Sequence, residues 1–245
     1  MVMPFGIEYA WRPSWGLIER TYVRLLGVLD LPNRLRARLV LNELNALKYR
    51  KVLDVGSGTG CYSFYLSRDD RIEVSAVEID EARVSDSSHI AKHLKKRNLN
   101  FYGGSANGHL QKFPSKTFEI ALAIEVFQYI PDVPFTLREI YRVLKPGGHL
   151  FGHVPVLGYL RPQEKTLFDD RIIQMMLSEQ NFQIVKIIPT FGGMLYEFCG
   201  LFDRISRSRF LAGILFPLIL LTSTAFSVEN PKGRYRFFMA RKPAE

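Results

Sequence analysis

A short apolar segment that runs directly into three closely spaced glycines limits the folds open to this sequence more than any other feature. Residues 52–55 have the composition of a buried β-strand, and Gly56, Gly58 and Gly60 follow it before a helical stretch. Glycine adopts positive φ and has no side chain, so a ligand can lie against such a turn. In open α/β sheets, ligands bind at the carboxyl ends of the strands. The pattern therefore predicts a ligand-binding turn in a mostly parallel sheet.

The rest of the sequence alternates between β-rich segments and helical stretches, which is typical of an α/β fold. Helices are predicted at about 61–68, 81–97, 134–143 and 166–180. They lie between seven predicted strands, which are 51–55, 72–78, 100–103, 119–125, 149–154, 183–189 and 234–240. Right-handed crossovers between such strands produce a doubly wound, mostly parallel seven-stranded sheet with helices on both faces. The sequence 145–148, Lys-Pro-Gly-Gly, predicts a turn between a helix and the fifth strand.

Two further helices are predicted before the first strand. Leucines recur at helical intervals over 16–29 and over about 35–47, and Leu31-Pro32-Asn33 is expected to separate the two helices. More than forty residues lie between the last two predicted strands. We therefore expect four parts, which are an N-terminal helical cap (1–49), a ligand-binding core (50–192), a hydrophobic insert (193–233) and a final strand that completes the core (234–245).

The formal net charge of +9 is concentrated at the two ends of the sequence. Residues 1–50 hold eight basic and four acidic side chains, residues 201–245 hold eight and three, and residues 51–200 hold 17 of each. Nucleic acid or an anionic membrane would attract such segments, and solvated helix faces explain the charge equally well. Two cysteines cannot form a disulfide framework, and the first residues lack the pattern of a signal peptide. We expect a reducing, cytoplasmic location.

Glu78 closes the second predicted strand, where a carboxylate can accept hydrogen bonds from both hydroxyls of a ribose. The third glycine comes one position earlier than in the dinucleotide-binding fingerprint, and no Gly-Lys-Ser/Thr of a phosphate-binding loop follows. The sequence VLDVGSGTG (52–60) instead resembles the first motif of class I S-adenosylmethionine-dependent methyltransferases. The resemblance covers about 50–155 and includes FPSKTFEIALAIEVFQYIPD (113–132) and LREIYRVLKPGGHLFGHVP (137–155). These segments are similar to the ubiquinone/menaquinone-biosynthesis type of methyltransferase domain.

The resemblance implies a Rossmann-like methyltransferase fold whose last strand is antiparallel, with S-adenosylmethionine as cofactor and S-adenosylhomocysteine as product. It implies that Glu78 holds the ribose and that Ile79 lies against the adenine. Ser105 departs from the Asp that the family often has beside the adenine amino group. A neutral hydrogen bond, from Ser105 with or without Asn107, would have to replace that carboxylate. The remaining implied cofactor contacts, at the methionine end, beside the adenine and beneath the sulfonium, are Asp54, Gly56, Ser57, Gly58, Gly60, Ala106, Glu125 and Val126.

Some quinone O-methyltransferases carry a metal-associated Glu-x-x-Glu-His after the fourth strand, but Gln128 and Tyr129 occupy two of its three polar positions here. We therefore expect no catalytic metal, and no other His, Asp or Glu set has ligand spacing. His153, at the carboxyl edge of the fifth strand, is a candidate general base, with a structural histidine as the alternative. Gln128 and Tyr129 are candidate substrate contacts.

The insert contains an uncharged stretch, 210–228, that approaches the length of a membrane span. One crossing would separate the last two strands, which pair in this fold, and Pro217 interrupts the stretch. Arg204, Arg207 and Arg209 come immediately before this stretch, and basic residues bind anionic lipid. We therefore expect residues 204–228 to lie at the inner face of a membrane, or to form a buried cap or an oligomer contact.

The apolar insert favours a methyl acceptor that is lipophilic, such as a lipid, a quinone or a polyprenyl-linked precursor. The alternatives are a polar metabolite or sugar, and a non-catalytic, cofactor-binding scaffold. Nucleic acid is not expected as a substrate or partner, because the base-flipping signature Asn/Asp-Pro-Pro-Tyr/Phe is absent after the fourth strand.

Overall fold

The computed structural model describes residues 6–11, 16–27, 31–156, 168–206 and 227–244. The chain forms two compact units, one of residues 1–48 with 190–233 and one of residues 49–189 with 234–245. We call them the helical unit and the sheet unit. The N-terminal segment and the segment before the last strand, which are far apart in the sequence, thus belong to one unit.

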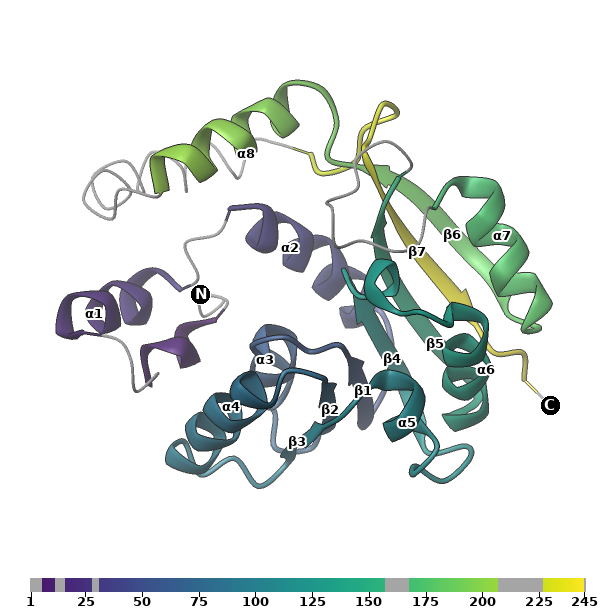
Figure 1. Ribbon diagram of the computed structural model, residues 1–245, viewed down its shortest axis with the longest axis horizontal. Coiled ribbons are helices and arrows are strands. Elements are labelled where there is room, and N and C mark those ends of the chain that lie inside the picture. The colour runs from purple at the N-terminus through teal and green to yellow at the C-terminus, as the bar shows by residue number, and fades with distance from the viewer. Residues whose placement is uncertain (1–5, 12–15, 28–30, 157–167, 207–226, 245) are drawn as a thin grey trace. The chain divides into compact units, whose positions relative to one another are not determined.

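A seven-stranded sheet forms the centre of the sheet unit (Figure 1). Its strand order is β3-β2-β1-β4-β5-β7-β6. The strands are β1 (Lys51–Val55), β2 (Glu73–Glu78), β3 (Leu99–Gly103), β4 (Phe118–Ile124), β5 (Leu144–Pro155), β6 (Gln183–Thr190) and β7 (Tyr235–Arg241). Neighbouring strands from β3 to β5 pair in parallel, whereas β7 pairs antiparallel with β5. The predicted doubly wound, mostly parallel sheet with an antiparallel last strand is confirmed.

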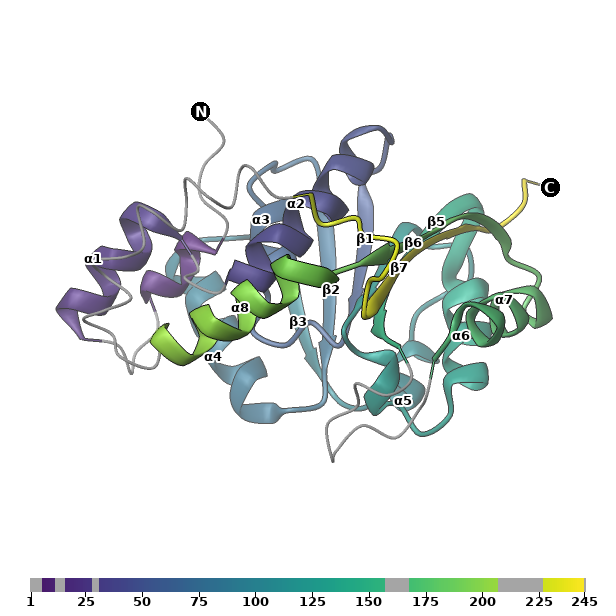
Figure 2. The same ribbon diagram turned by 90° about the horizontal axis from the view of Figure 1, so that it is seen from above.

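Helices cover both faces of this sheet (Figures 1 and 2). One face carries α3 (Cys61–Leu66) and α4 (Glu81–His93), and the other carries α5 (Ala106–Leu110), α6 (Val133–Val143) and α7 (Asp170–Glu179). A short 3-10 helix, η2 (Phe127–Tyr129), follows β4. Side chains of Asp80, Asp132 and Asp169 accept backbone N–H groups at the first turns of α4, α6 and α7, which explains where these helices begin.

The direction of winding reverses between β1 and β4. Strands β2 and β3 lie on one side of β1, and β4, β5, β7 and β6 lie on the other. The loops that leave β1 and β4 therefore run to opposite faces of the sheet. Ligands bind at this position, at the carboxyl ends of the strands, in open α/β folds.

The predicted turn at 145–148 is wrong, because these residues belong to β5. The register between β4 and β5 shifts there, so that Phe118 pairs with Leu144 and Ile120 with His149. The N–H of Gly147 donates to the carbonyl of Lys242 (2.9 Å), and the N–H of Lys242 donates to the carbonyl of Gly148 (2.8 Å). The irregular segment stays in the sheet because the chain after β7 satisfies its backbone groups, a tertiary contact that the local sequence does not reveal.

The helical unit contains η1 (Ile7–Trp11), α1 (Leu17–Leu26), α2 (Leu31–Asn45) and α8 (Gly193–Ser206). Gly27 has a φ of +74° and its N–H donates to Val23 O (2.8 Å), a glycine stop that ends α1. The prediction that Leu31-Pro32-Asn33 separates the helices is wrong, since α2 begins at Leu31. Proline is tolerated in a first turn, where its missing N–H would have no intrahelical partner.

Most of the uncharged stretch 210–228 lies outside the described residues. The prediction that it forms an interfacial helix, a cap or an oligomer contact therefore stays a prediction. Within the described ranges, no helix is long and apolar enough to cross a membrane.

Candidate functional site

The turn between β1 and α3 contains three glycines in the left-handed region of backbone conformation. Their φ angles are +66° at Gly56, +57° at Gly58 and +79° at Gly60. The N–H groups of Gly56 and Ser57 donate to the carbonyl of Val77 in β2, at 2.8 and 3.0 Å. The turn is thus fixed by backbone hydrogen bonds to the neighbouring strand.

These glycines differ in what surrounds them. A Cβ on Gly56 would lie 2.2 Å from Val126 Cγ2, and a Cβ on Gly60 would lie 2.7 Å from Phe101 Cζ. A Cβ on Gly58 would meet nothing closer than 3.9 Å. Gly56 and Gly60 therefore allow close packing within the protein, whereas Gly58 borders a space that only the end of the Arg83 side chain approaches within 4 Å.

Gly103, the last residue of β3, also borders open space, since an added Cβ would meet nothing within 4 Å. Gly103 was not among the residues predicted for the site. The pair Gly103-Gly104 directly after a predicted strand is the signal that indicates it. Gly58 and Gly103 leave room for a ligand at the carboxyl ends of β1 and β3.

Glu78 ends β2 between these two strands and is 6% exposed. Its Oε2 accepts the N–H of Gly58 (2.7 Å), and its Oε1 accepts the N–H of Asp80 (3.0 Å). A carboxylate has about four lone-pair sites, so each oxygen retains capacity for a further donor. The adjacent Ile79 is 70% exposed, an apolar side chain left open to a ligand.

Asp54 in β1 is buried, and its Oδ2 accepts a hydrogen bond from Ser63 Oγ (2.6 Å). Burial raises the pKa of Asp54 to about 6, against the lowering effect of the Ser63 hydrogen bond and with a further rise from the charge of Glu78. A buried carboxylate with an adjacent negative charge favours a cationic ligand. Ser63 was not predicted as a site residue. Its contact with Asp54 depends on how α3 packs against β1, which the sequence does not show.

Three polar residues near the turn and at the start of α5 take different positions. Ser57 Oγ is buried and has no hydrogen-bond partner among the described residues. Ser105 Oγ accepts the N–H of Gly108 (3.1 Å), so this hydroxyl caps α5, whose first residue is Ala106. Asn107 Oδ1 accepts a hydrogen bond from Thr136 Oγ, which leaves its amide nitrogen for a ligand. Of these three side chains, Ser57 is therefore the one whose buried polar atom lacks a hydrogen-bond partner among the described residues.

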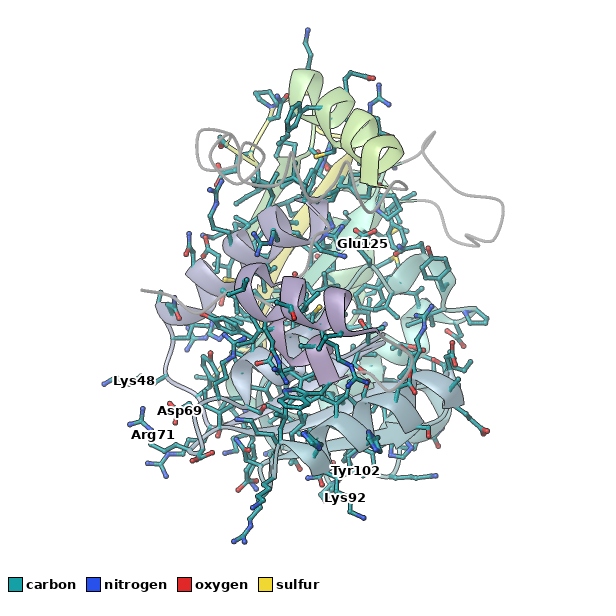
Figure 3. All side chains as sticks on the ribbon, turned by 90° about the vertical axis from the view of Figure 1, so that its left-hand side faces the viewer. Lys48, Asp69, Arg71, Lys92, Tyr102 and Glu125 are labelled. Carbon is teal, nitrogen blue, oxygen red and sulfur yellow. The ribbon has the colours of Figure 1, made fainter. Side chains whose placement is uncertain are left out.

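A polar cluster of Glu125, Gln128 and His153 lies at the carboxyl ends of β4 and β5. Glu125 has a φ of +58°, and its N–H donates to the carbonyl of His153 (2.8 Å). Its Oε1 pairs with His153 Nδ1, and Gln128 Nε2 lies 3.5 Å from its Oε2. Figure 3 shows Glu125 far from the surface ion pair of Asp69 and Arg71. The predicted residues Glu125, Gln128 and His153 thus form one group.

His153 is fully buried, and its ring stacks on Tyr235 with 5.3 Å between the ring centroids. This burial does not support a direct contact between His153 and a substrate. Tyr129, in contrast, is 39% exposed, and Val126 packs against the turn at Gly56.

Glu119 lies near the amino end of β4. Burial tends to raise its pKa, but the pKa is lowered overall by hydrogen bonds from Lys145 and from the N–H groups of Lys51 and Arg50. It is therefore a structural residue remote from the carboxyl edge. Among the described residues, no group of three or more His, Cys, Asp or Glu side chains could hold a metal ion. The absence of a catalytic metal stays a prediction.

Comparison with known sequences shows what the core is similar to. Residues 53–152 match the family described as "Methyltransferase domain". The ubiquinone/menaquinone biosynthesis C-methyltransferase UbiE of Pasteurella multocida is 27% identical over 188 residues, which cover 72% of this chain and 64% of the relative. A ubiquinone biosynthesis O-methyltransferase of Aliivibrio fischeri is 29% identical over 119 residues, which cover 49% of this chain and 50% of the relative. The chain thus spans half to somewhat less than two thirds of the length of these relatives.

Comparison with solved structures agrees on the fold. A phosphoethanolamine N-methyltransferase 2 of Haemonchus contortus, in complex with S-adenosyl-L-methionine, superposes with a TM-score of 0.64 at 18% identity, over 85% of this chain and 52% of that one. At this identity the likeness shows the fold alone. The family match runs from β1 to β5, and the strand order and the antiparallel β7 agree with it. The sheet unit therefore has the fold of class I S-adenosylmethionine-dependent methyltransferases, and its residues 53–152 match a methyltransferase domain, as the sequence predicted.

Proposed function

We propose that this protein transfers a methyl group from S-adenosylmethionine to a lipophilic acceptor such as a quinone or a related lipid. The observation that carries the proposal is the carboxyl edge of β1, β2 and β3. There the Glu78 carboxylate, the open faces of Gly58 and Gly103 and the buried Asp54 lie together. These features fit an adenosine with a cationic amino-acid chain.

The described residues fit this cofactor. Glu78 accepts hydrogen bonds from the ribose hydroxyls with its remaining lone pairs, and exposed Ile79 covers the adenine. Ser57 Oγ, which is buried without a partner, binds a polar group of the methionine end, and Asp54 lies beside its positive charge. S-Adenosylmethionine supplies a methyl group that is already activated on a sulfonium. The protein's contribution is to hold donor and acceptor in line and to exclude water.

A lipophilic acceptor is supported by two observations. The relatives from Pasteurella multocida and Aliivibrio fischeri act, by their names, in ubiquinone biosynthesis. The sequence 210–228 is uncharged, as a surface for an apolar molecule would be. A cytoplasmic location, peripheral on the inner face of a membrane through 204–228, agrees with the excess of basic residues in 1–50 and 201–245. The atom methylated stays open, because these relatives include a C- and an O-methyltransferase.

Replacing Glu78 with alanine should weaken the binding of S-adenosylmethionine about 10- to 100-fold, because two charge-assisted hydrogen bonds are lost. Glu73→Ala is a matched control at the other end of β2, where Glu73 pairs with Lys51 on the surface. Calorimetric titration of both variants with S-adenosylmethionine measures the effect, and thermal unfolding reports the fold. Equal affinity of the two folded variants contradicts the proposed ribose contact.

The acceptor class can be tested with the purified protein, methyl-labelled S-adenosylmethionine and an extract of the cells that produce the protein. After incubation, partition between an organic solvent and water should leave the label in the organic phase. Label confined to the aqueous phase contradicts the lipophilic acceptor and indicates a polar metabolite or sugar. Cofactor binding without any transfer of label contradicts catalysis and indicates a scaffold.

A further inference from the structure

We propose that Glu125 accepts the proton that the acceptor releases during methyl transfer, and that His153 is a positioning residue for Glu125. This inference rests on the proposed function and deepens it. The resemblance implies that Glu125 lies beneath the sulfonium, and the place of His153 at the carboxyl edge makes it a candidate base, whereas the structure supports a different division of roles.

The backbone of Glu125 is held in a conformation that glutamate rarely adopts. Its φ of +58° lies in the left-handed region, which costs about 1–3 kcal/mol for a residue other than glycine. The N–H of Glu125 donates to the carbonyl of His153 (2.8 Å), one step beyond the last pair of the β4–β5 ladder, Ile124 with His153. Strain of this kind persists where the surrounding structure imposes it, and it is concentrated at functional sites.

Exposure separates the two partners of the hydrogen bond between Glu125 and His153. The side chain of Glu125 is 24% exposed, whereas that of His153 is 0% exposed. The imidazole lies on Tyr235, and its Nδ1 is engaged by Glu125 Oε1. A molecule that approaches from the carboxyl edge can therefore contact the Glu125 carboxylate. It does not contact the buried His153 imidazole, which can act on it only through its hydrogen bond to Glu125.

Gln128 supplies an independent sign that a ligand completes this cluster. Its side chain is fully buried, with Nε2 3.5 Å from Glu125 Oε2, a distance too long for a strong hydrogen bond. Its Oε1 is buried without a hydrogen-bond partner among the described residues. Such an unmet acceptor is costly unless a donor arrives. A second O–H or N–H group of the bound acceptor, other than the one that gives its proton to Glu125 Oε2, would supply that donor.

The proton and electron balance of the step is simple. The nucleophilic atom of the acceptor forms a bond to the methyl carbon, and the carbon–sulfur bond breaks with its electron pair left on sulfur. The proton of the nucleophilic group passes to Glu125 Oε2. A neutral His153 that donates from Nδ1 to Oε1 keeps the carboxylate in one orientation. The proton then leaves to water through the exposed part of Glu125.

Glu125→Gln tests the proposal because it preserves the shape and removes the proton acceptor. We expect kcat to fall about 100-fold or more, the range of general base catalysis, with the affinity for S-adenosylmethionine unchanged within about two-fold. The assay follows label from methyl-labelled S-adenosylmethionine into the extract component that the wild type methylates. If Glu125→Gln does not fold, Glu125→Gly takes its place, since glycine adopts a φ of +58° without strain.

The role of His153 is tested by two variants and a control. His153→Leu should lower kcat about ten-fold with little change in KM, and His153→Asn should recover part of the loss, because its amide nitrogen can replace the Nδ1 donor. His149→Asn, four residues before His153 in β5, is the matched control and should leave kcat unchanged. Equal loss in the Leu and Asn variants contradicts positioning through a hydrogen bond.

The outcomes separate this inference from the proposed function. A wild type that binds S-adenosylmethionine but labels nothing overturns the proposed function and this inference with it. Transfer by Glu125→Gln at the wild-type rate overturns the inference alone. If Glu125→Gln has an unchanged kcat and binds S-adenosylmethionine more weakly, the inference is also overturned. Glu125 is then a cofactor contact, as the resemblance implies.

Discussion

Alanine at Gly56 should destabilise the sheet unit by about 2–5 kcal/mol, whereas alanine at Gly58 should cost about 1–2 kcal/mol and mainly weaken cofactor binding. Both residues have positive φ, +66° and +57°, so both variants carry the strain of a left-handed alanine. At Gly56 the new Cβ also lies 2.2 Å from Val126 Cγ2 and 2.7 Å from Val126 Cβ. At Gly58 the new Cβ meets only Arg83 Nη1, at 3.9 Å, so the methyl group remains where the ligand is expected.

Urea denaturation of the two variants measures the first difference, and calorimetric titration with S-adenosylmethionine measures the second. Adding Val126→Ala to Gly56→Ala removes the shorter contact and should restore part of the lost stability. The same addition to Gly58→Ala has no contact to relieve and should restore nothing. Two glycine variants of equal stability contradict the packing that the structure shows at Gly56.

Asp54→Asn should raise the free energy of unfolding at pH 7 by about 2–3 kcal/mol and weaken S-adenosylmethionine binding at least about ten-fold. The pKa of Asp54 is raised by burial from 3.8 to about 6 in the folded protein. Below pH 3.8 both states hold the proton and the group contributes nothing. Between pH 3.8 and about 6, Asp54 holds its proton in the folded state and loses it in the unfolded state. The contribution of Asp54 to the free energy of unfolding therefore falls as pH rises, and it remains unfavourable above pH 6.

Asparagine cannot titrate and can still accept the hydrogen bond from Ser63. The gain in stability should therefore be present at pH 7 and absent below pH 3.8, a dependence that denaturation at several pH values measures. Asp69→Asn is a control of opposite sign, since hydrogen bonds from Arg71 lower the pKa of Asp69 to about 2 on the surface. Loss of stability at pH 7 in Asp54→Asn would show that the buried charge is stabilising without a ligand.

The opposing expected effects of Asp54→Asn on stability and binding are typical of a functional site. A carboxylate that lowers stability in the free protein becomes favourable when a cation lies beside it. The unpaired Ser57 Oγ and Gln128 Oε1 are similar cases, because each is a buried polar atom without a partner among the described residues.

Much of the fold could be predicted because its signals are local. Alternating hydrophobicity and the glycines after 52–55 indicate strands, helices and a ligand-binding turn. The failures, at Pro32 and at 145–148, occur where a proline or glycine signal has two structural meanings. Proline ends one helix and begins another equally well, and glycines form a turn or an irregular strand according to the partner that the chain after β7 provides.

The sequence by itself determined the order of elements, the similarity of the core to a methyltransferase domain and the residues at the carboxyl edge. Strand–turn–helix patterns place those residues independently of the contacts that their side chains make. Only the tertiary structure decided what each residue does there. Gly56 faces Val126 while Gly58 borders open space, and His153 is enclosed behind Glu125. The physical reason is that open space and burial depend on side chains from other strands, and no local pattern of residues encodes those neighbours.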